Sequence, residues 1–158
     1  MKFSTQEDYG LRCLLQIAGR PLTETALTIP EISRLEGLSQ THVAKLLMIL
    51  RQGGFVRSSR GQAGGYRMAR EAGEITVGEV LEALGGKLYD SDFCERHSGQ
   101  LDVCTHAVDC GVRSLWQNVQ KAVDAVVDRI TVADLVGPQI NLPEKRFEDR
   151  TDRIPLFQ

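Results

Sequence analysis

The sequence predicts a mainly α-helical fold with one small β-hairpin, arranged as a winged helix-turn-helix followed by a long helix. Three observations in the 158-residue chain indicate this fold. Hydroxyl-x-x-acid tetrads stand before apolar helical stripes at four places. A glycine-containing turn joins two of the predicted helices, and two short strands with a glycine-rich reversal follow directly. A strong apolar stripe then occupies residues 111–130.

Capping boxes mark where the predicted helices begin, because the hydroxyl and the carboxylate satisfy free backbone N–H groups. The boxes are Ser4 with Glu7, Thr28 with Glu31, Thr76 with Glu79 and, in a weaker form, Thr131 with Asp134. They predict helices over about 5–19, 29–36 and 77–84. In the second of these helices, Ile32 and Leu35 are expected to face the core.

The helix-turn-helix is predicted where Gly37 separates the second helix from a third, which Ser39 can cap. The apolar stripe of this third helix consists of Val43, Leu46, Leu47 and Leu50. A glycine pair at 53–54 ends the helix. Residues 55–59 and 66–69 are then predicted as two strands around a glycine-rich turn, which is the arrangement of a wing.

The composition is typical of a soluble globular protein, with 42% apolar and 25% charged residues. The chain contains no run of eighteen apolar residues, so no membrane span is predicted. Its first eight residues lack the apolar core of a signal peptide. A cytoplasmic location is therefore expected. In that reducing compartment, the four cysteines are expected to be metal ligands or free thiols rather than disulfides.

Charge is distributed unevenly along the chain, although the net charge is only −2. Residues 37–70 carry no acid and six basic residues, Lys45, Arg51, Arg57, Arg60, Arg67 and Arg70. Residues 71–110 carry nine acids against Lys87 and Arg96. Because the basic segment coincides with the helix-turn-helix and the hairpin, it is where a polyanionic partner is expected to bind.

The open face of the third helix carries the side chains expected to read DNA. The N-terminal half of a recognition helix enters the major groove, where Gln and Lys reach base edges and Thr and His reach bases or phosphates. Arginines on a hairpin suit phosphates or the adjacent minor groove. The predicted DNA-contacting residues are Gln40, Thr41, His42 and Lys45 on the helix and Arg57, Arg60, Gly61 and Arg67 on the hairpin.

Residues 87–110 show neither a helical nor a strand period, yet they hold three of the four cysteines. Cys94, Cys104 and Cys110 are separated by nine and five residues. Thiolates select iron–sulfur clusters, zinc or copper, and a metal centre would order a loop of this length. Cys13, in contrast, lies among apolar residues of the first helix and is expected to be a small buried hydrophobe.

Three stretches of the chain resemble the Rrf2 family of winged helix-turn-helix transcription regulators, which includes the iron–sulfur regulators of the IscR and NsrR types. The stretches are MKFSTQEDYGLRCLLQIA, LSQTHVAKLLMILRQGGFVRSSRGQAGGYRMA and ITVGEVLEAL. The resemblance covers residues 1 to about 136, and RGQAGGYRMA is its most specific part. It implies a homodimer on a palindromic double-stranded operator with half-sites about one helical turn apart. It also implies that Arg60 enters the minor groove.

The resemblance further implies an iron–sulfur cluster, of the 2Fe-2S or 4Fe-4S type, on the three loop cysteines. The first cysteine gap is wider than in IscR-type members, and Arg113 stands where those members have a ligating histidine. NsrR-type members use an acid of the first helix, supplied by the partner subunit, and Asp8 matches that position. His106 and His97 are the local alternatives for the fourth ligand, and zinc is the rival metal.

Four segments are expected from these observations. Residues 1–86 form the winged helix-turn-helix DNA-binding domain, and residues 87–110 form the cysteine-bearing cluster-binding loop. Residues 111–136 form a dimerisation helix and a short following helix, for which an ordinary packing helix is the alternative. Residues 137–158 are charged and interrupted by prolines, and are expected to be a flexible tail.

The expected function is a cluster-controlled transcription regulator, acting as a repressor or an activator. One alternative keeps the DNA-binding module and makes the cysteines a zinc or thiol redox switch. Another is a cluster carrier or redox enzyme. The sequence has no GxGxxG after a strand, no phosphate-binding loop and no CxxC, so an enzyme is not predicted.

Overall fold

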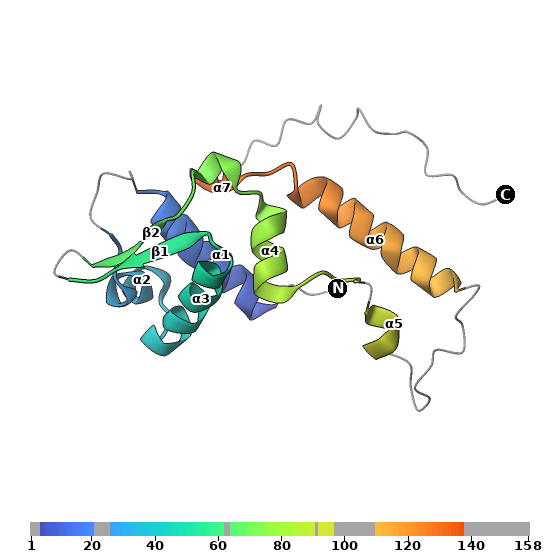
Figure 1. The fold of residues 1–158 in the computed structure, drawn as a ribbon, viewed down its shortest axis with the longest axis horizontal. Helices are drawn as coiled ribbons and strands as arrows, with labels where there is room; N and C mark the ends of the chain where they lie inside the picture. The colour runs from blue at the N-terminus through green and yellow to red at the C-terminus, as the bar shows by residue number, and fades with distance from the viewer. Residues whose placement is uncertain (1–3, 21–25, 62–63, 91, 97–109, 138–158) are drawn as a thin grey trace.

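The computed structural model describes residues 4–20, 26–61, 64–90, 92–96 and 110–137 (Figure 1). The elements in chain order are α1 (Thr5–Ala18), α2 (Ile29–Glu36), α3 (Gln40–Gln52), β1 (Val56–Ser59), β2 (Gly65–Met68), the 3₁₀ turn η1 (Ala72–Glu74), α4 (Val77–Gly85), α5 (Phe93–Arg96), α6 (Gly111–Val127) and α7 (Val132–Leu135). The predicted mainly helical fold with one hairpin is confirmed. Of the predicted tail, residues 137–158, all but the first residue lie outside the described residues.

All four predicted capping boxes form, each with both of its reciprocal hydrogen bonds. Ser39 caps α3 as expected, because its hydroxyl accepts the backbone N–H of His42. Gly37 ends α2 with a φ of 67°, a left-handed conformation that costs glycine little. The local signals in the sequence therefore set the boundaries of α1 to α4 to within about a residue.

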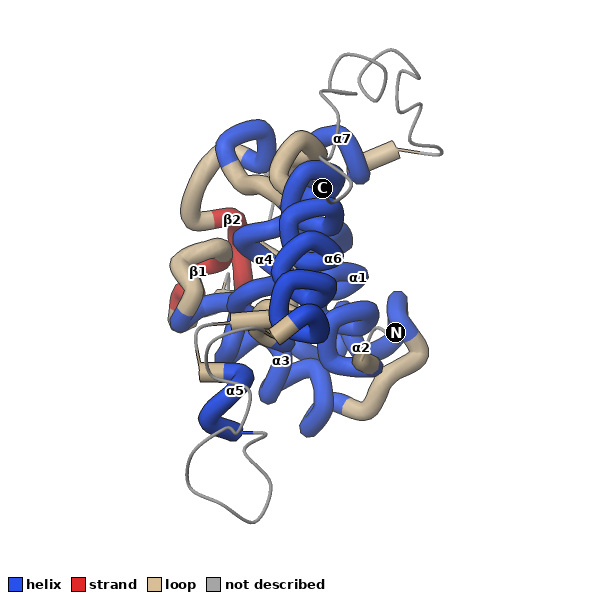
Figure 2. The backbone as a smooth tube through the Cα atoms, turned by 90° about the vertical axis from the view of Figure 1, so that its right-hand side faces the viewer, coloured by secondary structure: helices blue, strands red, loops and turns tan. Residues whose placement is uncertain are grey.

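The core lies where α1, α2, α3 and α4 meet behind the hairpin, as Figures 1 and 2 show. The whole predicted stripe of α3 is buried, namely Val43, Leu46, Leu47 and Leu50. Ile32 of α2 is also fully buried, but the prediction for Leu35 is wrong, because its side chain is 49% exposed. α2 is only two turns long, and its single buried position lies on the face that contacts α1 and α3.

The hairpin is antiparallel and pairs Val56 with Met68 at its base and Ser59 with Gly65 at its tip. Leu27 adds a third, one-residue strand that the sequence did not indicate. Its N–H donates to the carbonyl of Tyr66 at 3.1 Å, and the Tyr66 N–H donates back at 2.7 Å. The wing is therefore tied to the segment before α2 as well as to α3.

The segment after α4 contains a short helix, α5, although no periodicity was found there in the sequence. A contact between tilted aromatic rings supports it, because the Tyr89 and Phe93 ring centroids lie 5.1 Å apart. α6 then begins at Gly111 and ends at Val127, three residues earlier than the apolar stripe suggests.

α6 lies beside α4 and returns the chain to the core at its end (Figure 2). Val132 is fully buried, and its N–H donates to the carbonyl of Ile75 at 2.8 Å. The start of α6 differs, because Val112, Leu115 and Trp116 are 61%, 56% and 40% exposed. Among the described helices, none has the length and apolarity that crossing a membrane requires.

Candidate DNA interface and cysteine site

The recognition helix α3 presents polar side chains over its first turns. Gln40, Thr41 and Lys45 are exposed, and the buried stripe behind them fixes which way they face. His42 is half-buried, because its ring packs edge-on against Tyr9 of α1 with the centroids 5.6 Å apart. His42 therefore also helps to hold α3 against α1, a role that its position in the sequence did not indicate.

The wing carries a concave, arginine-lined site of about 430 Å³. Arg57 and Arg67 are direct register partners in the hairpin, so their side chains leave the same face of the sheet. Two like charges in this arrangement repel each other. The Nε of Arg67 is buried and has no hydrogen-bond partner among the described residues. An anion in this site would relieve the repulsion and satisfy that nitrogen.

The tip of the wing holds the remaining predicted contacts. Arg60 is exposed and lines the same arginine site, and Gly61 follows it with a φ of 105°. This φ belongs to the region that favours glycine, so the turn of the chain between β1 and β2 depends on Gly61. Gly61 directly follows the exposed Arg60. The predicted DNA-contacting residues thus lie on two surfaces, the open face of α3 and the face of the wing.

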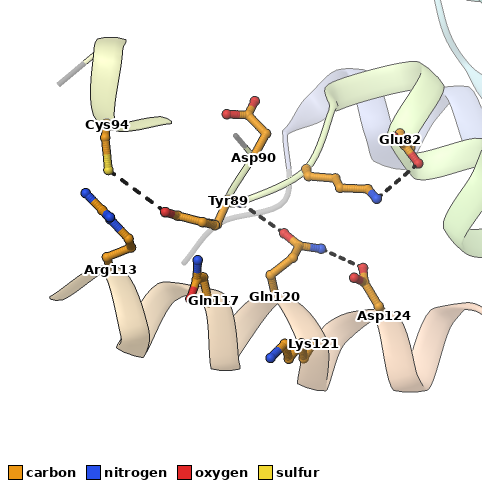
Figure 3. A pocket seen from close by; sticks show the side chains of 10 residues that line it. Glu82, Tyr89, Asp90, Cys94, Arg113, Gln117, Gln120, Lys121 and Asp124 are labelled. Atoms are coloured by element: carbon orange, nitrogen blue, oxygen red, sulfur yellow. Dashed lines mark hydrogen bonds and ion pairs between the residues drawn. The ribbon is translucent and has the colours of Figure 1, made fainter. Parts of the chain in front are cut away.

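Two of the three loop cysteines are described, and both lie next to the start of α6. Cys110 is the N-cap of α6, and its Sγ accepts the backbone N–H of Arg113 at 3.3 Å. Cys94 lies on α5, and the Arg113 side chain points toward it (Figure 3). A hydrogen bond with Cys94 is the main reason that the pKa of Arg113 is raised above its ordinary value. Arg113 therefore donates its backbone N–H to one sulfur and points its side chain toward the other.

A polar pocket of about 850 Å³ opens beside Cys94, between the segment after α4 and the face of α6 (Figure 3). Basic and acidic groups are balanced in its lining, with Lys87, Arg113 and Lys121 against Glu82, Asp90 and Asp124. This balance does not select an anion or a cation. The feature that distinguishes the pocket is the sulfur at its end.

Tyr89 and Gln120 position the wall of this pocket. The Tyr89 hydroxyl lies 3.9 Å from the Sγ of Cys94, and its pKa is raised first by burial and then by this contact. The Tyr89 N–H donates to the Oε1 of Gln120 at 3.0 Å, and the Nε2 of Gln120 donates to Asp124 at 2.6 Å. Gln120 is buried, so the segment is fixed to the middle of α6. Neither residue was singled out from the sequence, which offers no signal for such a contact.

The remaining predicted ligands have different outcomes. Cys104, His97 and His106 lie outside the described residues. Asp8 is exposed on α1 and pairs with Arg12 at 3.7 Å, and its role as a ligand from the partner subunit stays a prediction. Within the described ranges, no three His, Cys, Asp or Glu side chains form a group that could hold a metal ion.

Cys13 is fully buried in the core, as expected for a small hydrophobe. Burial is the main reason that the pKa of its thiol is raised, to about 11. A thiol with this pKa stays protonated at neutral pH and is a poor nucleophile and a poor metal ligand. Cys13 is therefore set apart from the cysteines of the loop.

Comparisons with known proteins agree with this architecture. Residues 3–138 match the Rrf2 family, described as an iron-dependent transcriptional regulator. The chain is 32% identical over 136 residues to protein rrf2 of Nitratidesulfovibrio vulgaris, covering 86% of this chain and 87% of that protein. The structure is similar to IscR of T. potens, with a TM-score of 0.67, 30% identity and 86% of each chain covered.

A second similar structure is CymR, the global cysteine regulator of B. subtilis. Its TM-score is 0.69 at 28% identity, covering 86% of this chain and 96% of that one. The winged-helix fold is confirmed by both structures. The prediction that the chain is not an enzyme is confirmed, because the family is described as a transcriptional regulator and CymR is named a regulator. The chain therefore belongs to the Rrf2 family of transcriptional regulators.

Proposed function

We propose that this regulator binds a palindromic operator as a homodimer, and that an iron–sulfur cluster held by the loop cysteines controls that binding. The observation that carries the proposal is that Cys110 caps α6 while Cys94 of α5 lines the same pocket as Arg113, a residue of the first turn of α6. α6 also exposes three large apolar side chains on one face over its first turns. The proposed sensor and the proposed dimer interface therefore share one turn of helix.

The DNA-binding part of the proposal rests on the wing and α3. Arg57, Arg60 and Arg67 present three charges on one concave face, and Gln40 and Lys45 are exposed on the neighbouring recognition helix. Arginines bind phosphates electrostatically, so their contribution depends on salt, whereas Gln and Lys hydrogen-bond base edges and provide sequence readout. This division of roles is typical of winged helices on duplex DNA.

The cysteine residues fit an iron–sulfur cluster chemically. Cys110 accepts the backbone N–H of Arg113, and Cys94 lies beside the Arg113 side chain and the Tyr89 hydroxyl. Cations and N–H or O–H groups next to a sulfur stabilise it as an anionic ligand. Cys104 lies six residues before Cys110 and would supply the third thiolate. A bound cluster would supply sensitivity to iron supply, redox state or nitric oxide. Asp8 of the partner subunit, or else His106 or His97, would complete the ligands.

The homodimer is proposed to form through α6. Val112, Leu115 and Trp116 lie on one helical face and are exposed over the first turns. Exposed large apolar side chains that share a face mark an interaction surface. A second copy packed on this face would set the distance between the two recognition helices, which must match half-sites one helical turn apart.

Anaerobic purification with iron and sulfide analysis tests the cluster. We expect a coloured protein with visible absorbance, and loss of iron and sulfide in Cys94→Ala and Cys110→Ala. Cys13→Ala is the matched control, because Cys13 is buried away from the loop and should leave the cluster in place. Footprinting with loaded and metal-free protein then tests control of DNA binding. Equal operator affinity in the two forms would contradict the proposal.

A second candidate is the same DNA-binding module with a zinc or thiol switch. The similarity to CymR favours the thiol form, because a structure of CymR from Staphylococcus aureus is described as the oxidized form. Stoichiometric zinc in a colourless, anaerobically purified protein would establish the zinc form. A thiol switch would instead show as metal-free protein whose DNA affinity changes reversibly with a disulfide reductant.

A further inference from the structure

The hairpin places two arginines directly opposite each other. Arg57 of β1 and Arg67 of β2 are register partners, so their side chains project from the same face of the wing. Opposed side chains of an antiparallel pair begin only about 5 Å apart at Cβ, and like charges in these positions repel each other. The pair therefore destabilises the wing unless a group of opposite charge lies between the two guanidinium groups.

No carboxylate supplies that opposite charge within the part of the chain that the structure describes. Arg70, three residues beyond Arg67, pairs with Glu79 at 3.3 Å. Arg57 and Arg67 make no such ion pair with any described residue. The segment 37–70 contains no acid that could provide one locally. The charge of the pair is therefore available to an anion from outside the chain.

The side chain of Arg67 has an unused donor. Its Nε is buried and has no hydrogen-bond partner among the described residues, although the residue as a whole is only half-buried. A buried N–H without an acceptor is costly, and a guanidinium cannot lose its proton to avoid that cost. The Nε–H and one Nη–H lie side by side in one plane and match two oxygens of a phosphate. Turning the Arg67 side chain to bring both donors into the site breaks no hydrogen bond of Nε, because Nε makes none.

The lining of the site consists of side chains that can donate hydrogen bonds. The concavity has a volume of about 430 Å³ and is lined by Arg57, Ser58, Ser59, Arg60 and Arg67. A water molecule takes up about 30 Å³ in the liquid, so this volume admits a phosphate group together with several waters. The pocket beside Cys94, in contrast, is lined by three acids and three bases and selects neither sign of charge.

We propose that Arg57 and Arg67 form a site for one phosphate group, which Arg67 binds through Nε and one Nη while Arg57 binds it from the opposite strand. Two sources offer this chemistry, the backbone of bound DNA and inorganic phosphate in solution. For the first source the inference rests on the proposed function, since it takes the protein to bind a duplex. Binding of inorganic phosphate requires no operator, cluster or second copy. Inorganic phosphate should then compete with DNA for the wing.

The first arm of the test titrates the full-length, DNA-free protein with inorganic phosphate, while chloride keeps the ionic strength constant. We expect the Nε–H resonance of Arg67 in NMR spectra to shift and to saturate. Arg51→Gln is the control, because it removes an exposed arginine of α3 that does not line the site. Arg67→Lys keeps the charge and loses the two planar donors, so phosphate binding followed at Arg57 should weaken roughly tenfold. Equal phosphate affinity in Arg67→Lys and wild type would overturn the proposed geometry.

The second arm uses the duplex identified by footprinting, with one backbone phosphate per half-site replaced by a neutral methylphosphonate. At one position, wild type should lose affinity about tenfold in fluorescence anisotropy, whereas Arg67→Gln should be indifferent to the replacement there. Exchange of chloride for phosphate at constant ionic strength should also weaken DNA binding more in wild type than in Arg67→Gln. Arg57→Gln provides the same comparisons if Arg67→Gln does not fold.

Dependence on Arg67 in both arms supports the site with the DNA backbone as its ligand in the complex. Dependence in the first arm alone supports the site with inorganic phosphate as its ligand. Independence of Arg67 in both arms overturns the inference, even where cluster-controlled operator binding is intact. A protein whose Arg67 resonance follows phosphate but which prefers no operator overturns the proposed function alone.

Discussion

The Nε of Arg12 on α1 donates a 2.7 Å hydrogen bond to the carboxylate of Glu36 at the end of α2. The Glu36 side chain is only 6% exposed, and Gln16 donates to its other oxygen at 2.6 Å. A nearly buried carboxylate is costly unless its oxygens are satisfied. Two donors from α1 therefore attach α1 to the first helix of the helix-turn-helix.

Removing Arg12 should destabilise the protein through this carboxylate. We expect Arg12→Ala to lower the urea midpoint of unfolding more than Arg51→Ala, a change at an exposed arginine near the end of α3. A double-mutant cycle of Arg12→Ala with Glu36→Ala should show a favourable coupling energy, because each change removes the same contact. Strictly additive effects would show that the pair contributes nothing.

The Thr76–Glu79 capping box should make stability depend on pH in acid. The backbone N–H of Thr76 is the main reason that the pKa of Glu79 lies below its ordinary 4.5, with Arg70 also contributing. A lowered folded-state pKa stabilises the protein above 4.5, and the contribution is lost as pH falls through the folded pKa. It should amount to about half a kcal/mol, because Glu79 is 44% exposed and screened by solvent.

Glu79→Gln tests this effect, because the amide keeps a capping-box acceptor and lacks the charge. Urea unfolding should show wild type to be more stable than Glu79→Gln at neutral pH, with the difference vanishing well below pH 4.5. A difference of the same size at both pH values would mean that the Glu79 charge is not its source.

Gly65→Ala should weaken the wing. The φ of Gly65 is 150°, and an added Cβ would lie 2.7 Å from the carbonyl oxygen of Leu27. The change strains the backbone and pushes apart the Leu27–Tyr66 bridge, at a cost of about 1–3 kcal/mol. Gly73→Ala is the control, since a Cβ there meets nothing within 4 Å. Thermal unfolding of the two variants measures the difference, and equal stabilities would contradict the role given to the bridge.

Arg60→Ala and Gln40→Ala should impair DNA binding in different ways. Arg60→Ala is expected to weaken binding to all duplexes and to reduce the slope of log affinity against log salt by about 1 per contact. Gln40→Ala should mainly relax the preference for the operator, by about 1–3 kcal/mol. Fluorescence anisotropy over a salt series, with Lys121→Gln as the distant charge control, separates these outcomes. An unchanged slope in Arg60→Ala would argue against entry of the Arg60 charge into the minor groove.

Leu115→Glu should dissociate the proposed homodimer, because it places a charge in the middle of the exposed apolar face of α6. Ser114→Glu adds the same charge on the other side of the helix, where the residue is also exposed, and should leave the dimer intact. Sedimentation velocity measures both. Wild type that sediments as a monomer, or Leu115→Glu that stays dimeric, would remove α6 from the interface.

The sequence predicted those parts of the fold that depend on local chemistry. The capping boxes at Ser4, Thr28 and Thr76 each require only a hydroxyl and an acid three residues apart, so their outcome did not depend on the rest of the chain. The stripe of α3 was also readable, because a helix buried on one face repeats its apolar residues regularly.

Contacts between distant segments were not predictable in this way. The pairing of Leu27 with Tyr66 and the hydrogen bond from Tyr89 to Gln120 join residues with no shared pattern. Leu35 fits the helical period of α2 but faces solvent. Periodicity shows on which side of a helix a residue lies, but it does not show whether another element covers that side. In the cysteine site, the residue types indicated metal chemistry, whereas the donors around Cys94 emerged only from the structure.

The attachment of α6 differs at its two ends, and this gives the helix the mechanics of a lever. Its far end is fastened by the backbone bonds that bring Val132 into the core, while its near end begins at a cysteine. With 17 residues, it is about 25 Å long. Pivoting by about 10° around the fastened end would carry the first turn roughly 4 Å sideways over that length. A rearrangement at the Cys110 sulfur would thus be passed on to the surface where Leu115 lies, slightly reduced because Leu115 is nearer to the pivot.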